Sequence, residues 1–191
     1  MDNDDDEPNV WHESIENLLA EYCDEAQVNE TLHRQAFWTN RKTLTWFQLP
    51  IIILSTISGS LQFLSKSISG YENIIVTCTG STSLFCAILS SIMSYLSLGE
   101  RMKSHMEART AWQNFYIHIK YQLKLAPVLR RPADEFMEEI KRTYERLFEI
   151  SPVIDRNTVS RLKKKLRNSD MILPNYINGM RSIVVYREED D

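Results

Sequence analysis

The stretch that decides the fold runs from Thr45 to Glu100: TWFQLPIIILSTISGSLQFLSKSISGYENIIVTCTGSTSLFCAILSSIMSYLSLGE. Between its two ends only Lys66 and Glu72 carry a charge, so two long uncharged segments are joined by a short charged connector. Ser, Thr, Gly and Gln are nevertheless scattered through both segments. Two interpretations compete: the stretch is either the buried core of a soluble helical bundle or a pair of passes through a lipid bilayer.

The length of the two segments favours the bilayer. Residues 43–65 form a run of 23 without a charge, and residues 73–99 form a run of 27. A helix needs about 20 predominantly apolar residues to cross a hydrocarbon core of about 30 Å. A helix of a soluble bundle normally keeps a charged face toward water, and neither run has one. We therefore predict an all-α fold built on a two-transmembrane antiparallel helical hairpin, with transmembrane helices at 44–65 and 73–99 and a short loop at 66–72.

The residues that flank the two spans predict their orientation. Lys and Arg are concentrated before the first span and after the second, whereas the connector holds only Lys66. Because cytoplasmic flanks are enriched in these residues, we expect a multi-pass membrane protein with both termini in the cytoplasm. Aromatic side chains are typical of the membrane–water interface. The residues predicted to lie at that interface are Trp38, Arg41, Lys42, Trp46, Arg101 and Lys103.

Composition is compatible with this interpretation without requiring it. The chain of 191 residues has a net charge of -4, but 11 of its 26 acids precede Arg34, where there is no Lys or Arg. The other 15 acids share the rest of the chain with all 22 basic residues. An acidic leader with a basic body suits a membrane-surface protein, although many soluble proteins are equally asymmetric. The leader, residues 1–9, is expected to be disordered and lacks the pattern of a cleavable signal.

Helical periodicity continues on both sides of the predicted spans. Apolar residues recur every three or four positions in residues 10–43, which predicts a pre-membrane helix. Residues 100–168 predict cytoplasmic helices that extend the hairpin. The first of these continues the second span, with Gly99 as its only candidate interruption, and stops at Pro127. A second begins around Pro132 and ends at Ser151-Pro152, and a third covers NTVSRLKKKLR. The tail, residues 169–191, holds one strand-like run from Ser182 to Tyr186 without an obvious partner.

Small and polar residues recur along one side of each span. Residues seven apart return to nearly the same side of a helix. Such a stripe can let helices approach closely, with each interhelical hydrogen bond contributing about 0.6 to 2 kcal/mol. It can also line a wet path on the axis of an oligomer, which the glutamines favour because a carboxamide in lipid needs partners. The stripe residues, predicted to face a packed helix or a pore, are Gln48, Ser55, Gly59 and Gln62 in the first span and Gly80, Ser83, Ala87, Ser90, Ser94 and Ser97 in the second.

The histidines and cysteines do not follow the spacing of any catalytic or metal-binding motif. His12, His33, His105 and His118 form no metal-binding motif, so each is expected on a helix face rather than as a ligand. Cys23, Cys78 and Cys86 are too few and too far apart for a disulfide framework or a zinc site. We predict no enzyme activity, no cofactor and no metal. The segment SRLKKKLR, with Arg130 and Arg131, can touch anionic headgroups or simply be a solvated helix face. It lacks interleaved aromatics, so we predict no nucleic-acid binding.

The order of these features resembles the SLATT superfamily, the two-transmembrane domains associated with SMODS and SLOG proteins. The matching pieces are LPIIILSTISG in the first span, Glu100, His105 and Ala108 after the second, and Tyr144, Leu147 and Ser151-Pro152. The late LPNYIN is similar to versions from large DNA viruses. The resemblance covers Leu32 to about Asn178. It implies a membrane effector that oligomerises and perturbs or permeabilises a membrane, often downstream of a nucleotide-sensing partner.

Two functional hypotheses follow. In the first, the protein inserts in a lipid bilayer, forms a homo-oligomer through its small-residue faces and acts as a pore-forming or membrane-perturbing effector, with a sensor protein as partner. In the second, it is a structural component of a host or virion membrane, for example one associated with a viral internal membrane or capsid. It would then dock a structural partner through its cytoplasmic helices. A soluble helical bundle is the third, weaker interpretation.

Overall fold

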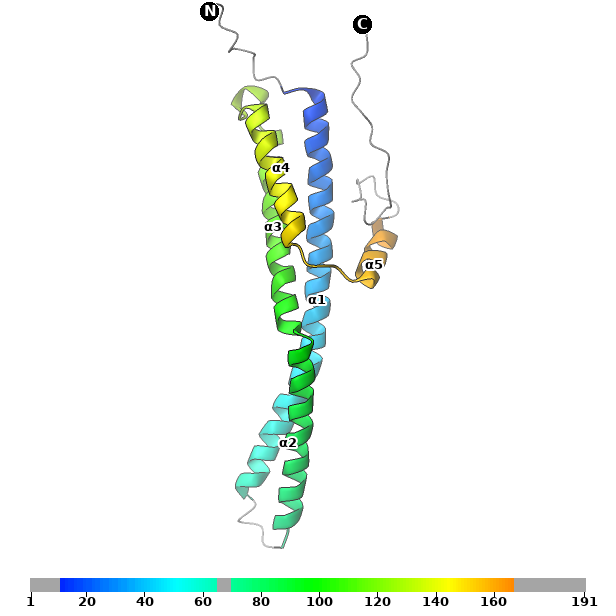
Figure 1. The fold of residues 1–191 in the computed structure, drawn as a ribbon, viewed down its shortest axis with the longest axis vertical. Coiled ribbons are helices and arrows are strands. Elements are labelled where there is room, and N and C mark those ends of the chain that lie inside the picture. Colours follow the sequence, from blue (N-terminus) through cyan, green and yellow to red (C-terminus); the bar gives the residue numbers. More distant parts are fainter. Residues whose placement is uncertain (1–10, 65–69, 167–191) are drawn as a thin grey trace, which may run out of the picture. The chain divides into compact units, whose positions relative to one another are not determined.

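A computed structural model describes residues 11–64 and 70–166 of the chain, and every regular element in these ranges is helical (Figure 1). The all-α prediction is therefore confirmed for the described residues. The elements are α1 (Glu13–Leu64), α2 (Glu72–Tyr95), α3 (Leu98–Lys124), the short 3-10 helix η2 (Pro127–Leu129), α4 (Ala133–Ile150) and α5 (Arg156–Leu166). The predicted leader and tail, the strand-like run and most of the predicted loop lie outside the described residues.

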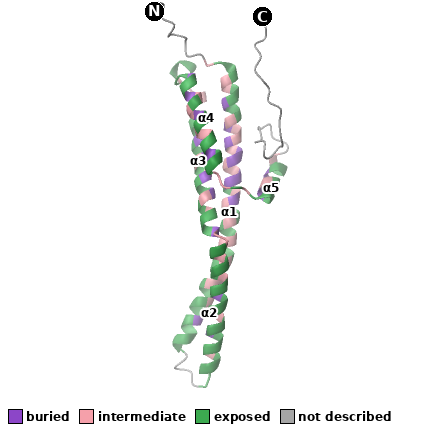
Figure 2. Cartoon of the chain, viewed as in Figure 1, coloured by how far each residue is buried: buried purple, intermediate pink, exposed green. Residues whose placement is uncertain are grey.

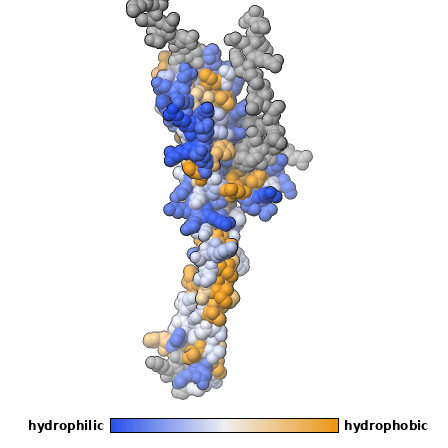
Figure 3. Space-filling view, viewed as in Figure 1, coloured by the Kyte–Doolittle hydropathy of each residue, from blue (hydrophilic) through white to orange (hydrophobic). Residues whose placement is uncertain are grey.

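The chain divides into two compact units, which we name by their composition. The bundle unit comprises Met1–Ala36 and Ser104–Asp191, and the apolar unit comprises Phe37–Lys103. Figure 2 shows how differently the two are built: buried residues recur along the helices of the bundle unit, whereas the helices of the apolar unit are mostly exposed, with few buried residues. In Figure 3 the bundle unit is mostly hydrophilic, while pale and apolar surface run side by side along the apolar unit.

Helix α1 continues through the boundary that we predicted between a pre-membrane helix and a first span. It contains 52 residues, and Pro50 is the only proline within it. Nothing in residues 13–49 breaks a helix, since this part contains neither glycine nor proline. Pro50 lacks the N–H that would bond one turn back, yet the helix continues to Leu64. The predicted pre-membrane helix and first span are therefore one element.

The helix that we predicted to continue after the second span is interrupted at Ser97, and not at Gly99, which was the only candidate interruption in the sequence. Ser97 has a φ of 47°, and α2 ends just before it, where the Leu96 N–H bonds to the Ile92 carbonyl at 3.0 Å. The Ser97 carbonyl then accepts from the Arg101 N–H at 3.0 Å and so begins α3. Gly99 lies inside α3, where its missing side chain costs only about 1 kcal/mol.

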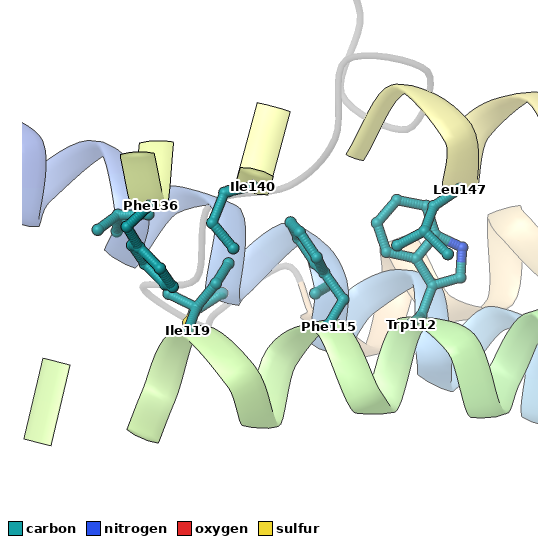
Figure 4. Close-up of a cluster of buried hydrophobic side chains, with 9 residues drawn as sticks. Trp112, Phe115, Ile119, Phe136, Ile140 and Leu147 are labelled. Carbon is teal, nitrogen blue, oxygen red and sulfur yellow. The ribbon is translucent and has the colours of Figure 1, made fainter. Parts of the chain in front are cut away.

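The core of the bundle unit lies between α1, α3 and α4. Figure 4 shows Trp112, Phe115 and Ile119 of α3 pointing at Phe136, Ile140 and Leu147 of α4. The Trp112 side chain is fully buried, and its Nε1 donates to the Ser151 Oγ at 2.9 Å. A smaller cluster joins α5 to α1 through Leu162, Val28 and Leu32. Prolines define the helix ends as predicted: η2 begins at Pro127, Pro132 precedes α4, and Ser151-Pro152 follows it.

Arg130 is buried in this unit rather than displayed for headgroups. Only 7% of its side chain is exposed. Its guanidinium donates to the Leu125 carbonyl at 2.9 Å and to the Leu123 carbonyl at 3.4 Å, pairs with Glu16, and lies 4.8 Å from the Trp11 ring centre. The last carbonyls of a helix have no partner within the helix. Arg130 therefore closes the end of α3 and ties it to the start of α1.

Candidate functional site

Two stretches of helix among the described residues are long and apolar enough to cross a membrane, one within Glu13–Leu64 and one within Glu72–Lys124. Their most apolar windows are only 6% and 11% buried inside the protein. A core helix of a soluble protein satisfies the same length and composition test but is mostly buried, so the low burial separates the two cases. The apolar unit is therefore where we look for a functional surface.

Within this unit the residues of α1 and α2 that are fully enclosed are small, while larger side chains such as Leu54 and Leu89 are only partly buried. Ser58, Thr79 and Cys86 are the buried residues of the unit apart from Leu98. The Ser58 Oγ donates to the Thr79 carbonyl at 3.4 Å across the two antiparallel helices (Figure 1). Large apolar side chains lie on the outside instead: Ile53, Phe85 and Ile88 are all half exposed or more. This order is the reverse of that in the bundle unit, whose buried residues include Trp, Phe, Ile and Leu.

The predicted stripe residues lie beside this contact rather than in it. In α2 the partly or fully buried positions include Thr79, Thr82, Cys86, Leu89 and Met93, and each is followed by a stripe residue that is exposed: Gly80, Ser83, Ala87, Ser90 and Ser94. In α1 we take the contact side from the partly or fully buried positions Phe47, Ile51, Leu54 and Ser58. Three of them are followed by the exposed stripe residues Gln48, Ser55 and Gly59, Ile51 is followed by the exposed Ile52, and Gln62 is exposed as well. Ser97 differs, since it is partly buried at the break between helices.

An offset of one residue places both stripes on the same side of the helix pair. One residue turns a helix by about 100°, in a fixed right-handed sense along the chain. Seen from one end of the pair, successive residues of α1 and α2 rotate in opposite senses, because the two chains run in opposite directions. The side chains that form the contact also point in opposite directions, toward each other. With both differences taken together, the residue that follows a contact residue lies on the same side of the helix pair in α1 and in α2. We call this side the polar face, defined by Gln48, Ser55, Gly59, Gln62, Gly80, Ser83, Ala87, Ser90 and Ser94.

The position before each contact residue lies, by the same reasoning, on the opposite side. There the side chains are mainly large and apolar: Trp46, Ile53 and Ile57 on α1, with Phe85, Ile88 and Ile92 on α2. A groove of about 520 Å³ follows Pro50 on this side, lined by Thr45, Trp46, Leu49, Pro50, Ile53 and Leu54. We call this side the apolar face. Large apolar side chains predominate on it, although Cys78 and Ser81 of α2 also lie on this side.

Most hydroxyls in these helices are satisfied within their own helix. The Ser83 Oγ donates to the Thr79 carbonyl at 2.9 Å, and Thr56, Ser60, Thr77, Thr82 and Ser91 make similar bonds one turn back at 2.8 to 2.9 Å. Such bonds remove the need for water or an external partner. The Gln48 carboxamide differs: within residues 11–64 and 70–166 it makes no hydrogen bond, and it is exposed on the polar face.

The predicted interface residues all lie on the surface. Trp46 is 79% exposed and Trp38 is 48% exposed, with the Arg41 guanidinium 5.0 Å from the Trp38 ring centre. Lys42, Arg101 and Lys103 are exposed as well. Amphipathic aromatic rings with an adjacent cation are typical of a membrane–water boundary.

Two of the four histidines lie on buried helix faces rather than on the surface. His33 and His105 are buried and contact each other, whereas His12 and His118 are exposed. Both buried residues follow a seven-residue spacing that was available in the sequence: Leu19, Ala26 and His33 in α1, and Leu98, His105, Trp112 and Ile119 in α3. Within the part of the chain that the structure describes, no three His, Cys, Asp or Glu residues gather as a metal site would require.

No known family model, curated protein or solved structure matches the chain. The SLATT resemblance therefore stays a prediction from the quoted motifs.

Proposed function

We propose that the protein is a two-span integral membrane protein that self-associates through its polar face and thereby permeabilises or perturbs the bilayer. The observation behind the proposal is the burial pattern of the apolar unit, which is the reverse of that in a water-soluble core. Ser58, Thr79 and Cys86 are buried, while many Ile, Leu and Phe side chains are exposed. Lipid tails solvate large apolar side chains, so helices in a bilayer pack through small residues instead. Both termini would lie in the cytoplasm of a host cell or on the inner side of a virion membrane.

The polar face supports self-association because a bilayer gives it no other partner. Small side chains let two backbones approach closely, and serine hydroxyls and glutamine amides can bond across such a contact. Gln48 carries particular weight, since a carboxamide without a partner is costly in hydrocarbon. The chain has no full charge between residues 43 and 65 or between 73 and 99. A wet path lined by this face would therefore pass small neutral solutes or ions with little charge selectivity.

The oligomer is tested with two matched serine variants. Ser83→Leu adds a bulky side chain to the polar face, and Ser81→Leu makes the same change two residues earlier, on the opposite side of α2. We expect Ser83→Leu to shift the protein toward monomer in lipid nanodiscs or mild detergent, as measured by mass photometry, and Ser81→Leu to leave the oligomer unchanged. A protein that is monomeric at every protein-to-lipid ratio, or that responds equally to both changes, would show that the polar face is not the contact.

Permeation is tested separately, with dye-filled liposomes. Inserted wild-type protein is expected to release a small neutral dye, and Gln48→Leu is expected to lower the release while leaving insertion intact. If the inserted oligomer releases no dye at any concentration, self-association stands but the protein does not form a pore.

The alternative is a structural membrane anchor, and one observation favours it. The bundle unit exposes apolar side chains on α3 and η2: Ile117, Tyr121, Val128 and Leu129 are between 51% and 94% exposed. Exposed apolar groups gathered in this way are typical of a surface that binds another protein. If the protein is an anchor, it binds a partner protein in a fixed stoichiometry. Tyr121→Ser is then expected to weaken this binding, and Gln48→Leu is expected to leave it unchanged.

A further inference from the structure

The contact between His33 of α1 and His105 of α3 belongs to the bundle unit. The two residues are 1% and 6% exposed, and their Nδ1 atoms are 3.1 Å apart. One Nδ1 must therefore donate a hydrogen and the other must accept it with its lone pair. The acceptor ring holds its only proton on Nε2, so the contact exists only while that ring is neutral.

We propose that the His33–His105 pair is a proton-sensitive contact: it joins α1 to α3 at neutral pH, and acidification separates the two helices at this point. A first added proton places a charge in a buried position, which costs free energy. A second proton occupies the accepting Nδ1 and breaks the hydrogen bond, leaving two cations about 3 Å apart. The proposal does not depend on membrane permeation, because it concerns only the bundle unit.

The charged groups on the surrounding elements do not favour a protonated pair. On α1 the charged neighbours of His33 are Glu30, about one turn earlier, and Arg34, the next residue; on α3 Arg101 and Arg109 each lie about one turn from His105. The Glu30 carboxylate is already engaged, since it accepts from the Arg109 Nε at 2.8 Å and lies 3.9 Å from Arg34. Glu107 follows His105 by two residues, about 200° around the helix.

The other packed elements add further cations. Helix α5, which contacts α1 at Val28 and Leu32, holds five basic residues and no acid: Arg156, Arg161, Lys163, Lys164 and Lys165. The Asp155 carboxylate, just before this helix, accepts from the Asn157 N–H at 3.1 Å. Helix α4 packs on the α3 cluster that includes Ala111 and Trp112, and its nearby acids Glu145 and Glu149 are exposed. A proton added to the histidine pair would therefore place a positive charge in a region where basic groups outnumber carboxylates that have no partner already assigned to them.

The direction of the pH effect follows from the state that binds more protons. Burial, and then the charge of His105, lowers the pKa of His33 from 6.5 to about 4. The open state, with an ordinary pKa, binds more protons below pH 6.5, so the contact is complete at neutral pH and weakens as the pH falls toward 4. With these two pKa values, the equilibrium constant for opening rises about thirty-fold between pH 8 and pH 5.

The test is hydrogen–deuterium exchange of the full-length protein in nanodiscs, with rates corrected for intrinsic exchange at each pH. Amides in residues 28–36 and 102–109 are expected to lose protection by about thirty-fold between pH 8 and pH 5. His33→Gln removes the titrating group and is expected to abolish this pH dependence, whereas the exposed control His118→Gln is expected to keep it. Unchanged protection in the wild type, or an equal loss in His33→Gln, would overturn the proposal.

A second measurement applies even when His33→Gln does not fold. Nuclear magnetic resonance of histidine rings labelled with ¹⁵N reports the protonation state of His33 in the wild type directly. We expect a neutral His33 ring at pH 6 that gains its proton only near pH 4. A ring that titrates near pH 6.5 while the helices stay together would refute the proposed coupling.

Discussion

Arg130→Met tests whether the basic pair at the end of α3 is structural. Sequence reasoning placed Arg130 and Arg131 together as candidates for headgroup contact, whereas the structure separates their roles. The Arg130 side chain is 7% exposed and that of Arg131 is 45% exposed. Methionine keeps an unbranched apolar side chain at this position and removes the guanidinium, together with its contact with the Trp11 ring. The change therefore isolates the polar interactions of one buried side chain.

The magnitude follows from the interactions that are lost. Hydrogen bonds from a charged group contribute about 1.5 to 3 kcal/mol each, and Arg130 makes a good one to the Leu125 carbonyl, a weaker one to the Leu123 carbonyl and an ion pair with Glu16. The Trp11 contact adds about 1 kcal/mol. Glu16 is 38% exposed and regains water when the partner is removed. We therefore expect a net loss of about 3 kcal/mol in the free energy of unfolding of the bundle unit.

The measurement must report on the bundle unit alone, because the apolar unit need not unfold with it. Hydrogen exchange of α3 and α4 peptides across a urea series, with the protein held in detergent, gives this local free energy. Arg131→Gln is the matched control, and its exposed pair with Glu139 predicts a loss below about 1 kcal/mol. Equal losses in the two variants would show that Arg130 does not close the end of α3.

Three further predictions concern packing and reactivity. Ile140→Ala removes a fully buried side chain from the core and is expected to lower the free energy of unfolding of the bundle unit by about 2 to 4 kcal/mol, as measured by the same urea series. Leu162→Ala is expected to release α5, since an isolated helix of 11 residues is marginal in water; faster exchange of α5 amides with unchanged exchange in α4 would show it. Burial raises the pKa of the Cys23 thiol to about 11, so maleimide at pH 7.5 is expected to modify it only after unfolding, as read by mass spectrometry.

Local signals in the sequence identified the helices and their ends. Pro127, Pro132 and Pro152 were sufficient to place the stops and starts around α4, because proline excludes a continuing helix for steric reasons. The break before α3 was not predicted, because the helical pattern continues and helix propensity singles out only Gly99, whereas the structure turns at Ser97 with a left-handed backbone. A serine at that position carries no local signal strong enough to predict the turn.

Contacts between residues far apart in the sequence could not be predicted from local sequence patterns. Arg130 bonds to Glu16 across 114 residues, and His33 reaches His105 across 72. A count of basic residues treats Arg130 and Arg131 as equals, and only the packing of α1 against α3 distinguishes them. The stripes were predicted as residues, but their position beside the α1–α2 contact, on a common side, required knowing which residues that contact encloses.

The two parts of α1 differ in which side chains they enclose and which they expose. Before Ala36 the inward positions are mostly apolar, as Leu19 and Ala26 are, because burying carbon away from water yields about 25 cal/mol per Å². After Phe37 the only fully buried residue of α1 among the described residues is Ser58, and Ile52, Ile53 and Ile57 lie on the outside. Such a helix would be badly placed in water along its second part, since nothing within the described chain covers those isoleucines. It is well placed if hydrocarbon surrounds them, because the free energy then comes from close backbone approach and hydrogen bonds rather than from apolar burial. The inversion within a single continuous helix is therefore a stronger argument for a bilayer than its length alone.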